Sequence, residues 1–186
     1  RMDPKRRPAA NCGMAYVIAF SGQGPDGARF LATEIVAGGA GGGPDAPGAH
    51  GTSTDVGNAR NTPVEIIEAE LPIRMISAER RRGSGGAGRF PGGDGVRRVY
   101  EALSDGIAVS IRGERFQRVP EGSAGGGAPK PAAAQIRRAG PGRPTDRGKL
   151  WRGGVWRGLT DQRVVPMSMA HWRISSMIGC GVWSGV

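Results

Sequence analysis

The sequence has few of the residues from which self-contained catalytic centres are usually built. Its 186 residues include two His and two Cys. It contains no HExxH, CxxC pair, GxSxG or Walker-type motif, so neither a zinc site nor a histidine-based catalytic triad has its usual parts. Because Cys12 and Cys180 lie far apart and no export signal accompanies them, we expect reduced thiols rather than a disulfide framework. Complete catalysis by this chain alone is therefore not expected.

Long apolar runs are also missing. No window approaches the roughly 18–20 uncharged apolar residues that a membrane-spanning helix requires, and no signal peptide is recognisable. The chain starts at Arg1 rather than Met, which we interpret as a start that lies further upstream. These features predict a soluble cytoplasmic protein with no membrane partner.

Glycine and proline are abundant instead. The chain has 34 Gly and 14 Pro, about a quarter of its residues, whereas these two types together usually supply about 12%. Because glycine loses the most backbone freedom on folding, such loops need tertiary contacts from elsewhere. The composition therefore predicts part of a larger assembly.

The net charge of +10 raises the possibility of nucleic-acid binding. Residues 1–60 carry six basic and five acidic side chains, residues 61–120 carry ten and eight, and residues 121–186 carry ten and three. The excess is concentrated in the tail, so a basic nucleic-acid-binding protein is kept as an alternative and nucleic acid is not the expected partner.

Apolar alternation and turn residues predict short strands separated by glycine-rich loops. The first two strands should form a hairpin around the Asp26-Gly27 turn, the later three a meander, and residues 121–135 a loop. Residues 38–51 are typical of a flexible linker. The predicted strands are 11–20, 29–37, 72–81, 95–103 and 106–116.

One short helix is expected near residues 63–71. Thr62 suits the N-cap, Pro63 the first helical position, and Glu65 completes a capping box. Its predicted apolar face consists of Ile66, Ile67 and Ala69. The fold class is therefore α+β: β-rich, with short strands, long Gly-rich loops and this single helix.

The last fifty residues differ from the rest. All four Trp lie beyond residue 150, Glu is absent after Glu121, and WRGGVWRG has neither a helical nor a strand period. We therefore divide the chain into residues 1–136 and an atypical basic tail, 137–186. The tail is expected to be disordered or to be the product of a frameshift.

Three further features invite functional interpretation. The glycines of residues 83–95 could cradle a phosphate, although the loop lacks the GxxxxGK[ST] spacing, and a tight structural connection is the favoured interpretation. Residues Arg80, Arg81 and Arg82 could bind an anion or could form a solvated strand end. His50 precedes a polar run at 52–55 but has no evident partner.

The order of three motifs is more specific than any one of them. GGAGGGPDAPG, then NARNTPVE, then RGSGGAGRFPGGDG resembles the C-terminal part of the hydantoinase B/5-oxoprolinase family, which also includes the acetone carboxylase alpha subunit. The resemblance covers residues 8–136. The matching residues, candidates for a substrate pocket or a structural motif, are Asn58, Arg60, Asn61, Thr62, Pro63 and Glu65 in the second element, and Gly83, Ser84, Gly85, Gly86, Gly88, Gly92, Gly93 and Gly95 in the third.

The chain also departs from this family in two places. It lacks the Gly-rich TPGGGGxG ending, which agrees with the frameshift hypothesis. Where the family often has H-x-H-M-T-N-T, this chain has STDVGNA, so no role of those histidines can be carried over.

The resemblance implies a fragment of the B-type subunit of an ATP-dependent cyclic amide hydrolase, inactive alone, acting on a hydantoin or 5-oxoproline. It implies a hydantoinase A-type subunit or domain as the partner. ATP and a divalent metal are implied for the complete enzyme, whereas no cofactor and no metal ligand are expected in this chain, and its catalytic residues are unknown. An acetone carboxylase-like subunit and a non-functional translated remnant are alternatives.

Overall fold

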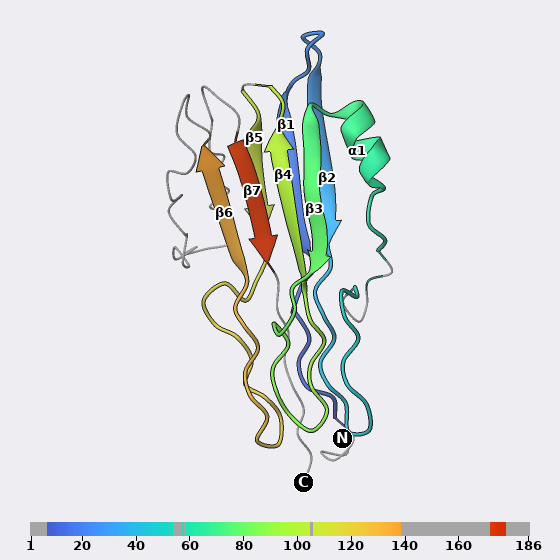
Figure 1. The fold of residues 1–186 in the computed structure, drawn as a ribbon, viewed down its shortest axis with the longest axis vertical. Helices are drawn as coiled ribbons and strands as arrows, with labels where there is room; N and C mark the ends of the chain where they lie inside the picture. Colours follow the sequence, from blue (N-terminus) through green and yellow to red (C-terminus); the bar gives the residue numbers. More distant parts are fainter. Residues whose placement is uncertain (1–6, 54–56, 58, 105, 139–171, 178–186) are drawn as a thin grey trace.

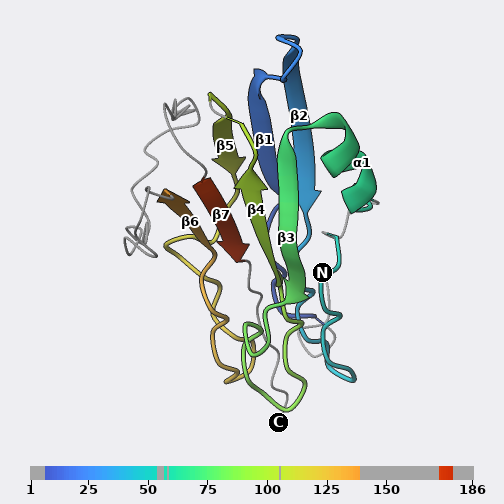
Figure 2. The ribbon, with the colours of Figure 1, turned by 45° about the horizontal axis from the view of Figure 1, so that its top comes forward.

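The computed structural model describes residues 7–53, 57, 59–104, 106–138 and 172–177. Two antiparallel sheets lie face to face, and long loops extend from one end of them (Figure 1; Figure 2). One sheet has the order β2 (Arg29–Val36), β1 (Tyr16–Gln23), β5 (Ala108–Arg112), and the other has β3 (Ile73–Arg80), β4 (Val96–Ala102), β7 (Trp172–Met177), β6 (Ala133–Arg138). With the helix α1 (Val64–Glu70), this confirms the expected β-rich α+β fold.

The predicted N-terminal hairpin is confirmed. Strands β1 and β2 pair from Tyr16 with Val36 to Gln23 with Arg29. In the turn, the side chain of Asp26 accepts a hydrogen bond from the N–H of Ala28 at 3.0 Å. Gly27 has φ +80°, a value that favours glycine, so the Asp-Gly pair sets the turn as the sequence indicates.

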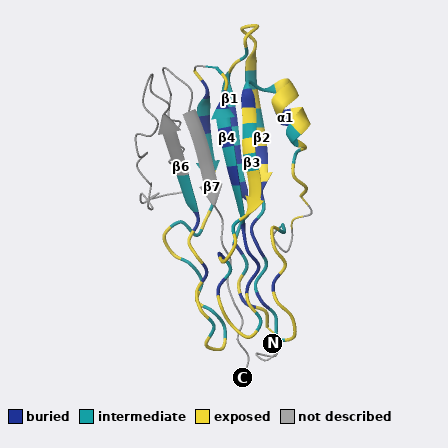
Figure 3. Cartoon of the chain, in the orientation of Figure 1, coloured by how far each residue is buried: buried dark blue, intermediate teal, exposed yellow. Residues whose placement is uncertain are grey.

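The core lies between the sheets. Along β1, Tyr16, Ile18 and Phe20 alternate with half-buried residues, as expected for a strand with one face in the core (Figure 3). The rings of Phe20 and Tyr100 meet edge to face with centroids 5.3 Å apart. Because β1 and β4 belong to different sheets, this contact joins the two layers.

Helix α1 lies beside β3 (Figure 1). Ile67 is its buried residue, and the Glu68 carboxylate accepts a hydrogen bond from the N–H of Met75 at 2.9 Å. In the part of the chain that the structure describes, β3 is an edge strand of its sheet, so α1 protects that edge from further pairing.

The predicted capping box of α1 is wrong. The N-cap is Pro63, and no side chain makes a capping hydrogen bond. Instead the Pro63 carbonyl accepts from Ile66 and Ile67 at 3.2 and 3.3 Å, so backbone bonds alone close the first turn. The buried face of α1 is also narrower than the predicted apolar face, because Ile66 and Ala69 are exposed.

The later strands exist where predicted, but their arrangement differs. Strand β5 pairs with β1 rather than β4, so the middle of the chain is not a meander. Strand β6 begins at Ala133, inside the predicted loop 121–135. Its pairing with β7, which is remote in sequence, is a tertiary effect that local turn residues do not reveal.

The C-terminal tail contributes one described element. Residues 172–177 form β7, which lies between β4 and β6. No strand was predicted for these six residues. Residues 139–171 and 178–186 lie outside the described part of the chain. Disorder and a frameshift in these residues therefore stay predictions. The division of the chain at residue 136 stays a prediction; β6 crosses that position.

The glycine-rich segment 38–51 is not a free linker. It runs beside residues 83–95 at the end of the molecule that carries the long loops (Figure 1). Backbone hydrogen bonds of 2.9 Å join Ala40 N–H to Ala49 O, Gly93 N–H to Ala40 O, and Gly48 N–H to Pro91 O. The two segments are therefore joined by irregularly spaced backbone hydrogen bonds and not by the regular pattern of a sheet.

Candidate functional site

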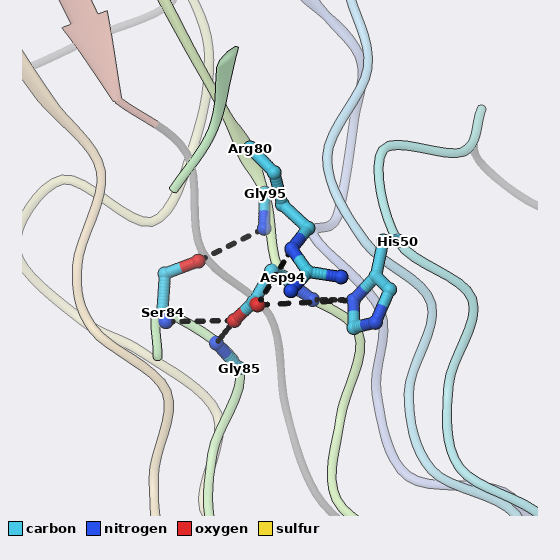
Figure 4. Close-up of polar contacts among 6 residues, drawn as sticks. All are labelled: His50, Arg80, Ser84, Gly85, Asp94 and Gly95. Atoms are coloured by element: carbon cyan, nitrogen blue, oxygen red, sulfur yellow. Dashed lines mark hydrogen bonds and ion pairs between the residues drawn. The ribbon is translucent and has the colours of Figure 1, made fainter. Parts of the chain in front are cut away.

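Asp94 organises the second glycine-rich loop (Figure 4). One of its carboxylate oxygens accepts hydrogen bonds from the N–H groups of Ser84 at 2.8 Å and Gly85 at 3.0 Å. The Ser84 hydroxyl in turn accepts from the N–H of Gly95 at 2.9 Å. Residues at the two ends of the loop are therefore tied together by a single buried carboxylate and the serine beside it.

His50 connects this loop to the first glycine-rich segment (Figure 4). Its Nδ1 accepts a hydrogen bond from the N–H of Asp94 at 2.8 Å. His50 therefore acts as an acceptor at Nδ1 in this contact. The half-exposed Arg80 guanidinium lies 3.5 Å from the other Asp94 oxygen.

The environment of Asp94 favours its ionised form. Burial alone would raise the pKa of this carboxyl, but hydrogen bonds from the N–H groups of Gly85 and Ser84 and the nearby Arg80 guanidinium hold it below its usual value. The carboxylate is therefore charged at neutral pH. Its lone pairs are engaged within the protein, which indicates a structural rather than an acid-base role.

The same bonds decide between the two interpretations of the loop. The N–H groups of Ser84 and Gly85 point to Asp94, that of Gly92 to Gly86 O, and that of Gly95 to Ser84. Gly93 donates to another loop, as described above. These donors are therefore occupied by protein acceptors, and the structure supports a tight connection and not a phosphate cradle.

The predicted glycines take part in this connection to different degrees. Gly83 has φ +66°. At Gly85 and Gly93 another backbone passes where a Cβ would lie. Gly88 is exposed, and nothing in the structure explains its match to the motif. The neighbouring Arg81 donates to the Pro131 carbonyl at 2.7 Å, so the arginine run serves at least partly to hold the loops together.

The second predicted group lies elsewhere, at a cavity of about 380 Å³ beside the start of α1. None of residues 83–95 lines it. Asn61 and Thr62 do, whereas Arg60, Pro63 and Glu65 do not. Asn58 lies outside the described residues. The complete lining is Asn61, Thr62, Val64, Met75, Ile76, Ser77, Ala78 and Arg98.

A buried polar cluster adjoins this cavity. Arg98 is 4% exposed and donates to the carboxylate of Glu34, which is 3% exposed. The Tyr100 hydroxyl donates to the other oxygen of the same carboxylate. Burial lowers the pKa of Arg98 and raises that of Tyr100, which keeps the phenol protonated. The cluster joins β2 of one sheet to β4 of the other.

No motif in the sequence singled out Asp94, Glu34 or Arg98 as functional residues. For the last two a signal exists: Glu34 has the same strand phase as Val36, and Arg98 the same phase as Tyr100, so both occupy inward positions. Charged residues at inward positions predict a buried pair. For Asp94 there is no comparable signal, because loop residues have no period.

The described residues offer no metal site. No three His, Cys, Asp or Glu side chains gather among them in a way that could hold an ion. No helix in the described part is long and apolar enough to cross a membrane. The divalent metal that the motif resemblance implies for the complete enzyme thus finds no cluster of ligands in the described part of this chain.

Comparison with known proteins places this chain in a family. The family model described as hydantoinase B/oxoprolinase matches residues 1–178, past residue 136 where the motif resemblance ends. A 5-oxoprolinase of Dictyostelium discoideum is 42% identical over 93 residues, 50% of this chain and 7% of that protein. A Pseudomonas sp. (strain NS671) protein, assigned by name as the B-type subunit of a D-/L-hydantoinase, is 32% identical over 109 residues, 58% of this chain and 18% of its own.

A solved structure shares the fold. A chain of nucleotide-free acetone carboxylase superposes with a TM-score of 0.67 at 13% identity, covering 94% of this chain and 26% of its own. At that identity the likeness concerns the fold alone. The present chain spans between 7% and 20% of the length of six curated relatives that it matches.

Proposed function

Because the chain belongs to the hydantoinase B/oxoprolinase family, we propose that it forms part of the B-type subunit of an ATP-dependent enzyme that hydrolyses a cyclic amide. The family match over residues 1–178 is the observation that carries this proposal. The names of two relatives, a 5-oxoprolinase and a hydantoinase of the B type, favour hydrolysis of 5-oxoproline or of a hydantoin. The likeness to acetone carboxylase concerns the fold and does not by itself favour carboxylation.

In this proposal the chain supplies a scaffold and one wall of a pocket. The Asp94 network and the packed glycine loops fix the shape of one end of the domain. ATP, when bound to the complete enzyme, would activate the amide oxygen by phosphorylation. Because the loop donors near Ser84 are occupied and no metal ligands gather among the described residues, we assign nucleotide and metal binding to other parts of the enzyme, including an A-type subunit or domain.

The name of the Pseudomonas relative, which denotes one subunit of a hydantoinase, supports a partner subunit. Association with an A-type partner would explain why a chain with so few catalytic residues takes part in chemistry. We place this enzyme in the cytoplasm, where ATP is available, and expect this chain to be inactive by itself.

A chimera tests the proposal. The segment of the Pseudomonas hydantoinase protein that matches this chain is replaced by residues 1–178, and the chimera is produced with its A-type partner. We expect ATP-dependent ring opening of a hydantoin or of 5-oxoproline, measured as the open-chain product together with ADP. A folded, assembled chimera that opens neither ring but carboxylates a ketone would contradict the proposal and favour the carboxylase alternative.

A further inference from the structure

The cavity beside α1 has the mixed lining of a small-molecule site. Its walls come from the segment that precedes the helix, from the first helical residue, from β3 and from Arg98 of β4. Asn61, Thr62 and Ser77 bring neutral hydrogen-bonding groups, and the remaining uncharged lining residues are apolar. Its volume of about 380 Å³ falls in the range of ligand pockets, and it is open to solvent on one side, where Asn61, Ile76 and Ala78 of its lining are exposed.

A break in β3 shapes this cavity. The register of β3 against β4 shifts between Met75 and Ser77, which leaves Ile76 as the extra residue. Ile76 is 42% exposed although it is a large apolar residue, and it lines the cavity. Such bulges redirect side chains and are frequent next to functional sites. Here the bulge leaves the apolar side chain of Ile76 in the lining of the cavity.

The positive charge of Arg98 at the cavity is neutralised by the buried carboxylate of Glu34. Arg98 is the only charged residue among the described lining residues, and its guanidinium is already paired with the buried carboxylate of Glu34. A second carboxylate in the cavity would share one cation with Glu34 and would lose hydration without a partner of its own. The lining therefore favours a ligand without net charge.

From these observations we infer that the cavity over Arg98 binds the ring of an uncharged cyclic amide and selects against a ring that carries a carboxylate. The inference rests on the proposed function, which supplies the substrate class, and adds the site and its selectivity. The carbonyl oxygens of an amide ring can accept from the arginine, and its carbonyl and N–H groups can both bond to the neutral polar residues, while its substituent packs against Val64 and Ile76. An uncharged hydantoin fits this chemistry better than 5-oxoproline, whose carboxyl group is ionised at neutral pH.

The test is ligand binding to the whole 186-residue chain at pH 7, measured by titration calorimetry without ATP or a partner subunit. The ligands are 5-methylhydantoin, 5-oxoprolinamide and 5-oxoproline. The last two have the same ring and differ in a neutral amide against a carboxylate. We expect saturable binding of both uncharged rings and at least about ten-fold weaker binding of 5-oxoproline, the factor that 1.4 kcal/mol represents.

Variants locate the binding. Ser77→Ala should weaken hydantoin binding several-fold, whereas Ser110→Ala, which changes another half-buried serine within a strand, should leave it unchanged. Asn61→Ala gives a second change on the cavity wall that spares the buried pair. Folding of each variant is checked by circular dichroism, and Arg98 is left in place because its removal would strand a buried carboxylate.

Two results would overturn the inference: no saturable binding of either uncharged ring to the folded chain, or equal effects of Ser77→Ala and Ser110→Ala. Binding of 5-oxoproline as tight as that of 5-oxoprolinamide would overturn the charge argument. A chimera that hydrolyses hydantoins while this chain binds none counts against the cavity alone. Binding without turnover in the chimera counts against the proposed function alone.

Discussion

Replacement of Gly93 by Ala tests whether close backbone packing holds the glycine loops together. Gly93 lies in the loop 83–95, and its N–H donates to Ala40 O at 2.9 Å. A Cβ at this position would collide with the Ala49 carbonyl, lying 2.6 Å from its carbon, whereas ordinary contacts begin at 3.4 Å. The obstacle is backbone, so no side-chain rotation relieves it and the two segments must separate by roughly 1 Å or more.

The size of the effect follows from the hydrogen bonds that cross this contact. A separation of that size takes the bonds from Gly93 to Ala40 and from Gly48 to Pro91, both 2.9 Å, beyond hydrogen-bonding distance. The two donors, the N–H groups of Gly93 and Gly48, belong to buried residues, and each costs about 1–3 kcal/mol when it is left unsatisfied. We therefore expect Gly93→Ala to lower the free energy of unfolding by about 2–6 kcal/mol, a large part of the 5–15 kcal/mol typical of a folded domain.

Gly43→Ala is the matched control. Gly43 lies in the companion segment 38–51, has no positive φ, and the nearest atom to an added Cβ is Ala46 O at 3.6 Å. This change should be neutral or stabilise the fold by about 0.4–1 kcal/mol. Urea unfolding followed by circular dichroism gives both values, and amide exchange at Ala40 and Gly93 reports the local opening. A loss below 1 kcal/mol for Gly93→Ala, or equal losses for both variants, would refute the packing argument.

Three further outcomes are expected. Because the pKa of Asp94 is lower in the folded protein than the unfolded value of about 3.9, its contribution is present above that pH and is lost as the pH falls through the folded value. Acid titration should therefore destabilise the wild type more steeply than Asp94→Asn below about pH 4, and parallel curves would disagree. Glu34→Gln leaves Arg98 buried without its carboxylate and should cost about 3–5 kcal/mol in urea unfolding. The double change Glu34→Leu with Arg98→Met should recover most of that loss, and no recovery would count against an unpaired charge as the cause. Thr62→Ala should change the free energy of unfolding by less than about 0.5 kcal/mol, since no side chain caps α1; a loss of 1 kcal/mol or more would assign the cap to Thr62.

The candidate site could be predicted only in part from the sequence. The motif NARNTPVE directed attention to Asn61 and Thr62, which do line the cavity. The same motif predicted a capping box that the structure does not contain. The capping rule considers only residue types, whereas in the structure the N-cap of α1 is Pro63, and no side chain makes a capping hydrogen bond. The other half of the cavity comes from β3 and β4, which the helix motif does not mention.

Local chemistry determined what depends on neighbours in the chain. Alternation of apolar residues specified β1 and β2, the Asp26-Gly27 turn specified their hairpin, and Ile67 with its flanking prolines specified one short helix. Two glycine-rich motifs and the Asn-Thr-Pro motif between them were enough to identify the family. These features require only a few consecutive residues, so the sequence by itself carries them.

Tertiary structure decided everything that joins distant segments. Three examples are the pairing of β5 with β1, the insertion of β7 between β4 and β6, and the hydrogen bond from Asp94 to His50. The residues that these contacts join are 34 to 95 positions apart in the sequence: Arg138 and Trp172 are 34 apart, and Val17 and Arg112 are 95 apart. Partner choice over such separations depends on which surfaces meet in the folded chain, and many partners are compatible with the same local pattern. The glycine loops show this most directly: their composition alone predicts flexibility, whereas their lack of side chains is what lets their backbones approach and bond.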